Sequence, residues 1–244
     1  MTADSASSLL QAGLDSLQIS ATPPQQQALL NYLDAMLEEN QSINVTAIRD
    51  REAAVVQHLL DSLTLIPWWR SVSQREAPRS LLDLGTGGGF PAAPLAILWP
   101  SCKVLAIDST LKKIGVVQRC AQRAGIKHLQ ARQARGSDLP GLVPRYRQHF
   151  ELATARAVGP ASKLLQELLP LTHLSGWIAL LKGTELPPAE QTATEKIVQR
   201  YKLLQFPPVL SQVSGLNSRA IWAFRRASAI KHQAELPAAS SETS

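Results

Sequence analysis

The sequence feature that most constrains the fold is the run from Leu81 to Pro91, Leu-Leu-Asp-Leu-Gly-Thr-Gly-Gly-Gly-Phe-Pro. Mostly aliphatic residues lead into a cluster of glycines, and an apolar run from Ala92 to Leu98 follows, so the pattern predicts a buried strand, a tight turn and a helix. Glycine can take positive φ and leaves room for a ligand beside the main chain, while the helix presents free N–H groups and a positive dipole end. This combination is typical of nucleotide-binding turns.

The spacing of the glycines separates two classes of ligand. A dinucleotide-binding turn has glycine at its first, third and sixth positions, where it seats a pyrophosphate and allows close helix packing. Gly85 and Gly87 occupy the first and third positions of this turn, but the sixth is Phe90. The aromatic residue argues against a pyrophosphate and favours a ligand with a carboxylate and a flat base, such as S-adenosylmethionine.

A second predicted strand, from Lys103 to Asp108, ends in an acid. Its distance from the glycine turn is that of the ribose-binding acids in such folds. Asp108 can therefore accept hydrogen bonds from both ribose hydroxyls. The alternative, weighed for the two features together, is a purely structural glycine turn with an ordinary surface aspartate.

Alternating strands and helices continue beyond this point and indicate a parallel sheet covered on both faces. Further strands are expected at residues 128–133, 150–155 and 176–181. Ligands of open parallel sheets bind beyond the carboxyl ends of the strands. We therefore expect one rim to gather the residues that follow the strands, namely Gly85, Asp108, Ala134, Arg156 and Lys182.

The flanking segments predict additions to this sheet. A short amphipathic turn through Leu9 to Leu17 is expected near the N-terminus, and Thr22-Pro23-Pro24-Gln25 has the pattern of a helix start with a capping box. At the other end, residues 201–212 and 219–224 indicate two strands joined by the turn Gly215-Leu216-Asn217-Ser218, an antiparallel hairpin at the sheet edge.

Between the N-terminal helix and the sheet, residues 51–65 predict a further helix. On it His58, Asp61 and Ser62 are three and four residues apart and share one face, either as a functional group or as a local His-Asp hydrogen bond. Residues 68–79 have the composition of a hinge. The predicted organisation is a small N-terminal helical subdomain (1–75), a main α/β domain (76–228) and a disordered tail (229–244).

Composition excludes several classes of protein. The 244-residue chain is 45% hydrophobic and can bury a sizeable core, yet its longest apolar stretch is interrupted by charged and helix-breaking residues. The polar residues at the start of the sequence lead us to expect no secretory signal. Cys102 and Cys120 fit no metal-binding spacing and indicate apolar packing in a reducing compartment. We expect a cytoplasmic protein with no metal site and no membrane contact.

The formal net charge of +6 favours a polyanionic partner such as nucleic acid, although charge alone is weak support. Two groups of basic residues are candidates for contacting it. The first is an exposed face on a helix expected at residues 111–124, and the second is an arm after the last strand. These groups are Lys112, Lys113, Arg119 and Arg123, and then Arg225, Arg226 and Lys231.

Taken together, the motifs between about Leu29 and Phe224 resemble the bacterial ribosomal RNA small subunit methyltransferase G family, also called glucose-inhibited division protein B. The matching motifs are Asn44-Val45-Thr46 with Arg49-Asp50, His58 with Asp61-Ser62, Gly85 to Pro91, Asp108-Ser109 before Lys112-Lys113, Arg156-Ala157, and Leu181-Lys182-Gly183. The resemblance implies a Rossmann-like S-adenosylmethionine-dependent methyltransferase that modifies N7 of one guanine in 16S ribosomal RNA, near the decoding centre. Its partner would be 16S ribosomal RNA or the small-subunit particle.

The resemblance also implies site residues. Family members bind the cofactor through the counterparts of Gly85, Phe90, the main chain of Ala134-Arg135, and Arg156; the glycine turn and strand-end patterns add Gly87 and Asp108. Relatives usually carry an acid where this chain has Arg135, so only a main-chain contact is expected there.

The implied methyl transfer needs few catalytic groups. Guanine N7 keeps a lone pair at neutral pH, so methyl transfer requires positioning and exclusion of water more than a strong base. Because the purine becomes cationic, a nearby carboxylate would stabilise the transition state, and Asp61 is the candidate, with Arg156 as the second catalytic residue. The alternatives are a methyltransferase for a small molecule or a protein, and a non-catalytic RNA-binding assembly protein; a nicotinamide-dependent oxidoreductase is disfavoured by Phe90.

Overall fold

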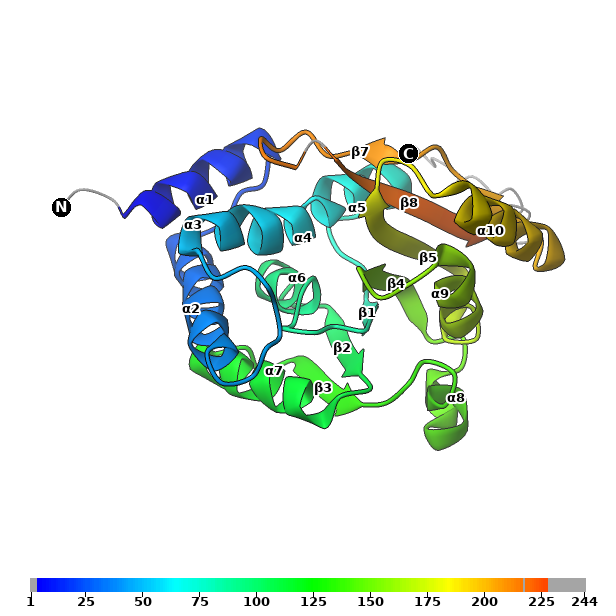
Figure 1. Cartoon of the computed structure of the whole chain (residues 1–244), viewed down its shortest axis with the longest axis horizontal. Coiled ribbons are helices and arrows are strands. Elements are labelled where there is room, and N and C mark those ends of the chain that lie inside the picture. The colour runs from blue at the N-terminus through cyan, green and yellow to red at the C-terminus, as the bar shows by residue number, and fades with distance from the viewer. Residues whose placement is uncertain (1–3, 217, 228–244) are drawn as a thin grey trace, which may run out of the picture.

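The computed structural model describes residues 4–216 and 218–227. In this part of the chain, eight strands form one mixed sheet (Figure 1). The strands are β1 (Ser80–Leu84), β2 (Lys103–Asp108), β3 (Leu129–Gln133), β4 (Phe150–Arg156), β5 (Thr172–Gly183), β6 (Leu203–Gln205), β7 (Val209–Leu210) and β8 (Arg219–Arg226). Their order is β3-β2-β1-β4-β5-β8-β6, with β7 also paired to β8. The first five strands are parallel and β8 runs antiparallel to β5, so the expected fold class is confirmed.

Helices cover both faces of the sheet (Figure 1). They are α1 (Ser5–Ser16), α2 (Pro23–Asn40), α3 (Arg51–Ala54), the π-helix η1 (Val55–Leu60), α4 (Asp61–Leu63), α5 (Leu65–Ser73), α6 (Ala92–Leu98), α7 (Leu111–Arg123), α8 (Leu139–Leu142), the 3-10 turn η2 (Pro144–Tyr146), α9 (Ala161–Leu168) and α10 (Pro188–Arg200). Elements α1 to α7 lie on one face, and α8, α9 and α10 lie on the other.

The two cores follow from the alternation of side chains along each strand. Leu81 of β1 and Val104 of β2 point into the core beneath the first group of helices, whereas their neighbours Leu82 and Leu105 point into the core beneath α9 and α10. Because successive strand residues face opposite sides, a strand buried on both faces is apolar throughout, as β1 almost is.

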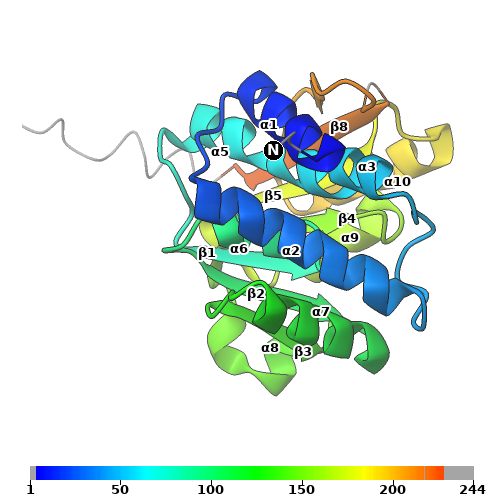
Figure 2. The same ribbon diagram turned by 90° about the vertical axis from the view of Figure 1, so that its left-hand side faces the viewer.

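The N-terminal helices belong to the first core, and Figure 2 shows α2 lying alongside α7. Helix α2 begins with the expected capping box, in which Thr22 N donates to Gln25 Oε1 at 2.9 Å and Gln25 N donates to Thr22 Oγ1 at 3.4 Å. The turn expected near Leu9 is instead the 12-residue helix α1, because Leu10 and Leu14 are fully buried against η1 and its neighbours. A domain boundary near residue 75 stays a prediction.

The segment expected to be a hinge is helical and buried. Trp68 and Trp69 lie in α5 with 4% and 3% of their surface exposed. Trp68 packs edge-on against Trp177 of β5, with ring centroids 5.8 Å apart. Burial of these large rings against the sheet outweighs the local turn signals in this stretch.

The predicted C-terminal hairpin is present, with a break. Strands β6 and β7 both pair with β8, and between them lie Phe206, Pro207 and Pro208. Proline has no N–H to donate to a ladder, which explains why the outer strand is split in two. Asn217 of the predicted turn, and the predicted tail with Lys231, lie outside the described residues. Among the described helices, none is long and apolar enough to cross a membrane.

Candidate active site

The glycine turn joins β1 to α6, and its glycines have different neighbours. Gly85, Gly87 and Gly89 all have positive φ, at 70°, 57° and 91°. A Cβ on residue 89 would overlap the Tyr32 hydroxyl, and a Cβ on residue 85 would lie 2.5 Å from Cγ2 of Val158. Of these three glycines, only Gly87 has open space, because the nearest atom to a Cβ built there is 4.0 Å away. The turn is therefore shaped by protein packing at two glycines and is open to a ligand at Gly87.

Tyr32 of α2 contacts this turn, and no motif in the sequence indicated that contact. Its hydroxyl donates to the carbonyl of Gly88 at 3.0 Å, and its ring packs edge-on against Phe90. Burial raises the pKa of the phenol well above its usual value, so the hydroxyl keeps its proton and remains a donor. At the sequence level Tyr32 has only the spacing of a core residue on a helix.

Asp108 closes the turn from the end of β2. Its Oδ2 accepts from Gly87 N at 3.1 Å and its Oδ1 accepts from Thr110 N at 2.8 Å. Each carboxylate oxygen has a further lone pair, so these bonds leave Asp108 able to accept from a ligand. The predicted pair of glycine turn and strand-end acid is thus one connected unit.

A cavity of about 470 Å³ opens at this rim of the sheet. Gly85, Asp108, Ala134 and Arg135 line it, as the shared rim of parallel strands predicts. Helix α9 contributes its other wall through Leu164 and Glu167. The volume is in the range of small-molecule sites. Apolar side chains such as Leu84 and Leu164, the main chain of Gly85 and a carboxylate with spare lone pairs fit S-adenosylmethionine.

Four of the predicted site residues lie away from this cavity wall. Gly87 bonds to Asp108, and Phe90 packs against Tyr32 of α2. Arg156 points toward α4, where it forms an ion pair with Asp61. Nη1 of Arg156 donates to Oδ2 of Asp61 at 3.0 Å, and the guanidinium also lies over the Phe90 ring, 5.6 Å from its centroid. The roles proposed for Arg156 and Asp61 stay predictions; what the geometry establishes is an ion pair between β4 and α4.

The π-helical turn supplies a second acceptor for Arg156. The amide at Asp61 bonds to the carbonyl of Val56, five residues back, and this skips the carbonyl of Gln57. Nη1 of Arg156 donates to that carbonyl at 2.8 Å. The helix expected over residues 51–65 is therefore present but distorted, and the distortion binds the strand-end arginine.

His58 lies between Arg156 and Phe90. Its ring stacks on Phe90 with centroids 4.8 Å apart, Nη2 of Arg156 lies 3.3 Å from Nδ1, and Thr46 Oγ1 lies 3.0 Å from Nε2. Because a guanidinium can only donate, Nδ1 accepts and Nε2 carries the proton. Burial, reinforced by the positive charge of Arg156, lowers the pKa of His58 to about 3, so the ring is neutral. The predicted shared face of His58 and Asp61 is thus organised by Arg156.

The Asn44-Val45-Thr46 motif has a structural role in the same cluster. Asn40 Oδ1 accepts from the amides of Val45 and Thr46, and Asn40 Nδ2 donates to the Thr46 carbonyl at 3.0 Å. These bonds hold the Thr46 hydroxyl against His58. Contacts therefore run from α2 through this loop to Arg156.

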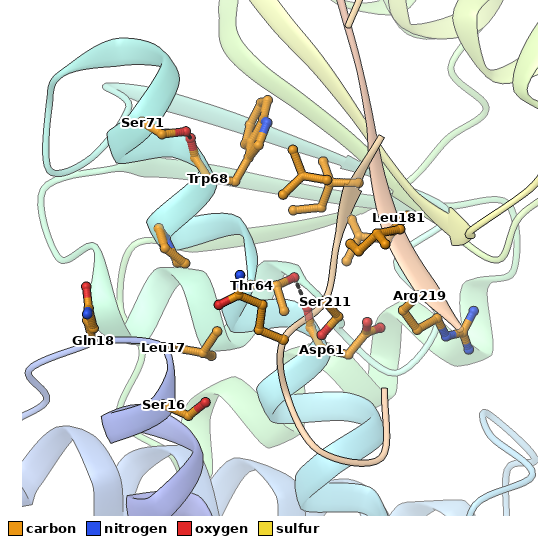
Figure 3. A pocket seen from close by; sticks show the side chains of 16 residues that line it. Ser16, Leu17, Gln18, Asp61, Thr64, Trp68, Ser71, Leu181, Ser211 and Arg219 are labelled. Atoms are coloured by element: carbon orange, nitrogen blue, oxygen red, sulfur yellow. Dashed lines mark hydrogen bonds between the residues drawn. The ribbon is translucent and has the colours of Figure 1, made fainter. Parts of the chain in front are cut away.

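A second cavity, of about 330 Å³, lies between α5 and the strands β7 and β8 (Figure 3). Asp61, Thr64 and Trp68 line one side, and Leu181 and Arg219 line the other. Among the described residues it shares no lining residue with the cavity at Asp108.

Lys182, the predicted rim residue of β5, anchors the loop after β4. Its Nζ donates to the Gly159 carbonyl at 2.9 Å and lies 2.9 Å from Glu190 Oε1. That loop carries Val158, whose methyl groups face Gly85, and Ala157 in it has a positive φ of 55°. Lys182 thus positions the segment that covers the glycine turn.

The predicted basic groups are placed differently from expectation. Arg119 and Arg123 on α7 form ion pairs with Glu39 and Glu38 of α2, at 2.6 Å each, and dock the two helices. Arg225 lies over Trp177, with 5.0 Å from its guanidinium carbon to the ring centroid. The expected basic face on α7 and the basic arm are therefore largely engaged within the protein.

Register explains why the C-terminal arginines are far from the cavity. Arg225 pairs with Trp177, near the amino end of the central part of β5, and β8 runs antiparallel to β5. Arg226 donates to the carbonyl of Leu169 at 2.9 Å on the same side. The rim near the cavity instead carries Lys113, Arg135 and Lys163. Within the described residues their side chains form no ion pair.

The fold is that of the Rossmann-like methyltransferases, with the glycine turn after β1, an acid at the end of β2 and an antiparallel last strand. Solved structures share this fold. A ribosomal protein L11 methylase from Lactobacillus delbrueckii subsp. bulgaricus has a TM-score of 0.52 and 17% identity, over 70% of this chain and 78% of that one. A candidate O-methyltransferase from Klebsiella pneumoniae has a TM-score of 0.58 and 14% identity, over 90% and 97% of the two chains.

The particular family follows from sequence comparison. The chain belongs to the GidB family, rRNA small subunit methyltransferase G, whose family model matches residues 25–220. Relatives of that name include proteins from Thermoanaerobacter sp. (36% identical over 155 residues) and Alkaliphilus metalliredigens (31% over 189 residues). The alignments cover 64% and 78% of this chain, and 62% and 77% of the respective relatives. This chain thus matches slightly less than two thirds of the Thermoanaerobacter protein.

Proposed function

We propose that this protein transfers a methyl group from S-adenosylmethionine to N7 of one guanine in 16S ribosomal RNA, near the decoding centre. The observation that carries the proposal is the bond of Asp108 to Gly87 N at 3.1 Å beside a cavity that Gly85 and Ala134 line, in a chain of this family. The proposed setting is the cytoplasm, where ribosomal RNA is assembled.

The residues around the cavity would hold the cofactor by distinct contacts. Asp108 would accept hydrogen bonds from the ribose hydroxyls, and the main chain of Gly85, which lines the cavity, would lie beside the methionine part. Leu164, which is 4% exposed, would pack against the adenine. The cofactor supplies an electrophilic methyl group on a sulfonium.

The contribution of the chain to transfer is positioning and exclusion of water. Guanine N7 carries a free lone pair, so no base is required to remove a proton. Val158 covers Gly85 and is 44% exposed, so its side chain can shield one end of the site. Arg156 would hold the π-helical turn and the Phe90 ring in place beside the site.

RNA would bind across the mouth of the cavity. Lys113, Arg135 and Lys163 line it and are free to contact phosphates on either side of an extruded nucleotide. This placement replaces the surface expected from the sequence, of which Lys113 remains.

The test is to incubate the purified protein with methyl-labelled cofactor and either naked 16S ribosomal RNA or purified small subunits, and to map the modified nucleotide. Label at N7 of a single guanine is the expected result, and the two substrates show whether RNA or the particle is used. An Asp108→Ala variant is the control. Label on protein or small molecules, or cofactor binding without transfer to RNA, would overturn the proposal.

A further inference from the structure

Glu167 is a carboxylate in the cavity wall for which the family motifs provide no role. It lies near the end of α9 and lines the cavity together with Ala134 and Arg135. Oε2 of Glu167 accepts from Gly136 N at 3.1 Å. A Cβ on residue 136 would lie 2.8 Å from that oxygen, so glycine at this position allows the carboxylate to sit against the main chain that follows β3.

The position of Glu167 relative to Asp108 suggests which part of a ligand it meets. Asp108 ends β2, and Ala134 follows β3, the neighbouring edge strand. Ala134 and the α9 residues Leu164 and Glu167 line the same cavity as Asp108, so a ribose bound at Asp108 has space for its base on that side. In the described cavity wall the acidic side chains are Asp108 and Glu167, and Arg135 beside them offers donors alone. Glu167 is thus the side-chain carboxylate at the base end of the cavity.

The hydrogen bonds of Glu167 leave one oxygen available. Oε2 is engaged by Gly136 N, and within the described residues no donor is bound to Oε1. Glu167 is half-buried, so an amine that reaches Oε1 would form a partly desolvated, charge-assisted hydrogen bond. Adenine presents such an amine at N6, whereas hypoxanthine and guanine present an oxygen at that position, which a carboxylate repels.

We propose that Glu167 reads the base of the cofactor by accepting a hydrogen bond from the N6 amine of adenine. This inference rests on the proposed function, because it assumes that the nucleoside part of S-adenosylmethionine occupies the cavity. Glu167 acts as a specificity-determining residue, and it takes over the acceptor function that Arg135, after β3, cannot provide.

The experiment compares two ligands that differ in the group at C6, an amine in one and an oxo group in the other, with the accompanying proton on N1 of the oxo form. Calorimetry measures the dissociation constants of S-adenosylhomocysteine and of its deaminated counterpart, S-inosylhomocysteine, for the wild type and for Glu167→Gln. The wild type is expected to prefer the adenosine form by at least about tenfold, because the oxo group leaves Glu167 facing an acceptor. Glu167→Gln is expected to reduce this preference at least about fivefold, since a rotated amide can donate to the oxo group.

Two further variants complete the design. Glu167→Met keeps the length of the side chain, removes both acceptors and is expected to abolish the preference, which provides a second measurement if Glu167→Gln does not fold. Glu195→Gln, on the exposed face of α10, is the matched control and should keep the wild-type ratio. If the wild type binds neither ligand, the proposed function fails. If it binds both and Glu167→Gln and Glu167→Met leave the ratio unchanged, the role of Glu167 is wrong.

Discussion

Arg156 at the end of β4 and Asp61 at the start of α4 form an ion pair across 95 residues of sequence, with 3.0 Å between Nη1 and Oδ2. The side chains are 13% and 2% exposed, so water screens this pair weakly. The same guanidinium binds the Gln57 carbonyl and contacts His58. One side chain thus connects the rim of the sheet to the π-helical turn.

Arg156→Lys tests these contacts, because it removes the guanidinium and keeps the positive charge. Lysine keeps the charge but cannot span the Gln57 carbonyl, Asp61 and His58 with a planar fork. Methyl transfer to a 16S-derived substrate is expected to fall at least about tenfold, roughly 1.4 kcal/mol in the barrier, while the fold persists. Cofactor affinity is measured beside transfer.

The outcomes for Arg156→Lys are distinct. If cofactor affinity and methyl transfer both fall, Arg156 supports the binding of the cofactor. If methyl transfer alone falls, Arg156 acts on the target guanine. The control is Asp61→Asn, which leaves the buried Arg156 without its charged partner and should lower the unfolding free energy by about 3 kcal/mol. If Arg156→Lys changes neither affinity nor transfer, the pair is purely structural.

Asp108→Ala is expected to weaken cofactor binding by about 1–3 kcal/mol, the cost of leaving polar partners unsatisfied. The structure adds a reason, because the carboxylate also holds the amides of Gly87 and Thr110. Asp108→Asn keeps one acceptor and should be intermediate. Calorimetric titration with S-adenosylhomocysteine measures both variants, and wild-type affinity in Asp108→Ala would remove this residue from the site.

The cavity rim is expected to determine how RNA affinity depends on salt. Changing Lys113, Arg135 and Lys163 together to Ala should weaken RNA binding and reduce the slope of log affinity against log salt by about 2, at roughly 0.7 per phosphate contact on a single strand. Gel-shift titrations over a series of salt concentrations give the slope.

A control variant that removes the same charge can be made at the opposite ends of the parallel strands. Arg79, Lys103 and Lys127 are exposed and precede or begin β1, β2 and β3, so they lie at the amino ends of the parallel strands. Their triple alanine variant removes the same charge and should leave the slope close to that of the wild type. Equal slopes for the two triple variants would place the RNA elsewhere.

His58 makes the stability of the protein depend on pH. Its pKa is about 3 in the folded state against 6.5 ordinarily, because burial and Arg156 disfavour the charged ring. Between these values the unfolded chain binds a proton that the folded chain does not, so the unfolding free energy rises with pH by up to about 1.4 kcal/mol per unit. The contribution of His58 to the unfolding free energy is fully present above pH 6.5 and is lost as the pH falls toward 3.

Comparison with His58→Gln isolates this contribution. Burial raises the pKa of Asp83 to about 6, which gives an opposite slope between pH 3.8 and 6 in wild type and variant alike. In urea unfolding at intervals from pH 4 to 6.5, the slope of unfolding free energy against pH should be more positive for the wild type than for the variant, by about one proton. Parallel curves would mean that His58 is protonated in the folded protein.

The strand, turn and helix around Gly85, and the acid at the end of β2, could be predicted from sequence because their signals are local. Glycines specify a backbone with positive φ, and apolar runs specify buried strands, whatever lies elsewhere in the chain. Parallel strands then bring their carboxyl ends to one edge, which places Asp108 and Ala134 in one cavity.

Other features were decided by contacts between distant segments. Tyr32 reaches Gly88 across 56 residues, and Arg119 reaches Glu39 across 80, so a residue with the pattern of a helix core supports the glycine turn and a basic face becomes a helix contact. Periodicity shows that a side chain is buried or exposed, but not which partner it meets.

Local sequence therefore determined the β-strand, the turn and the rim on which a nucleotide ligand would lie. Only the tertiary structure decided the direction of Arg156, the engagement of Arg225 at the far edge, and the meeting of Glu167 with Gly136. The physical reason is that a long charged side chain takes the direction in which its charge and hydrogen bonds are best satisfied, and those partners exist only once the helices are packed on the sheet.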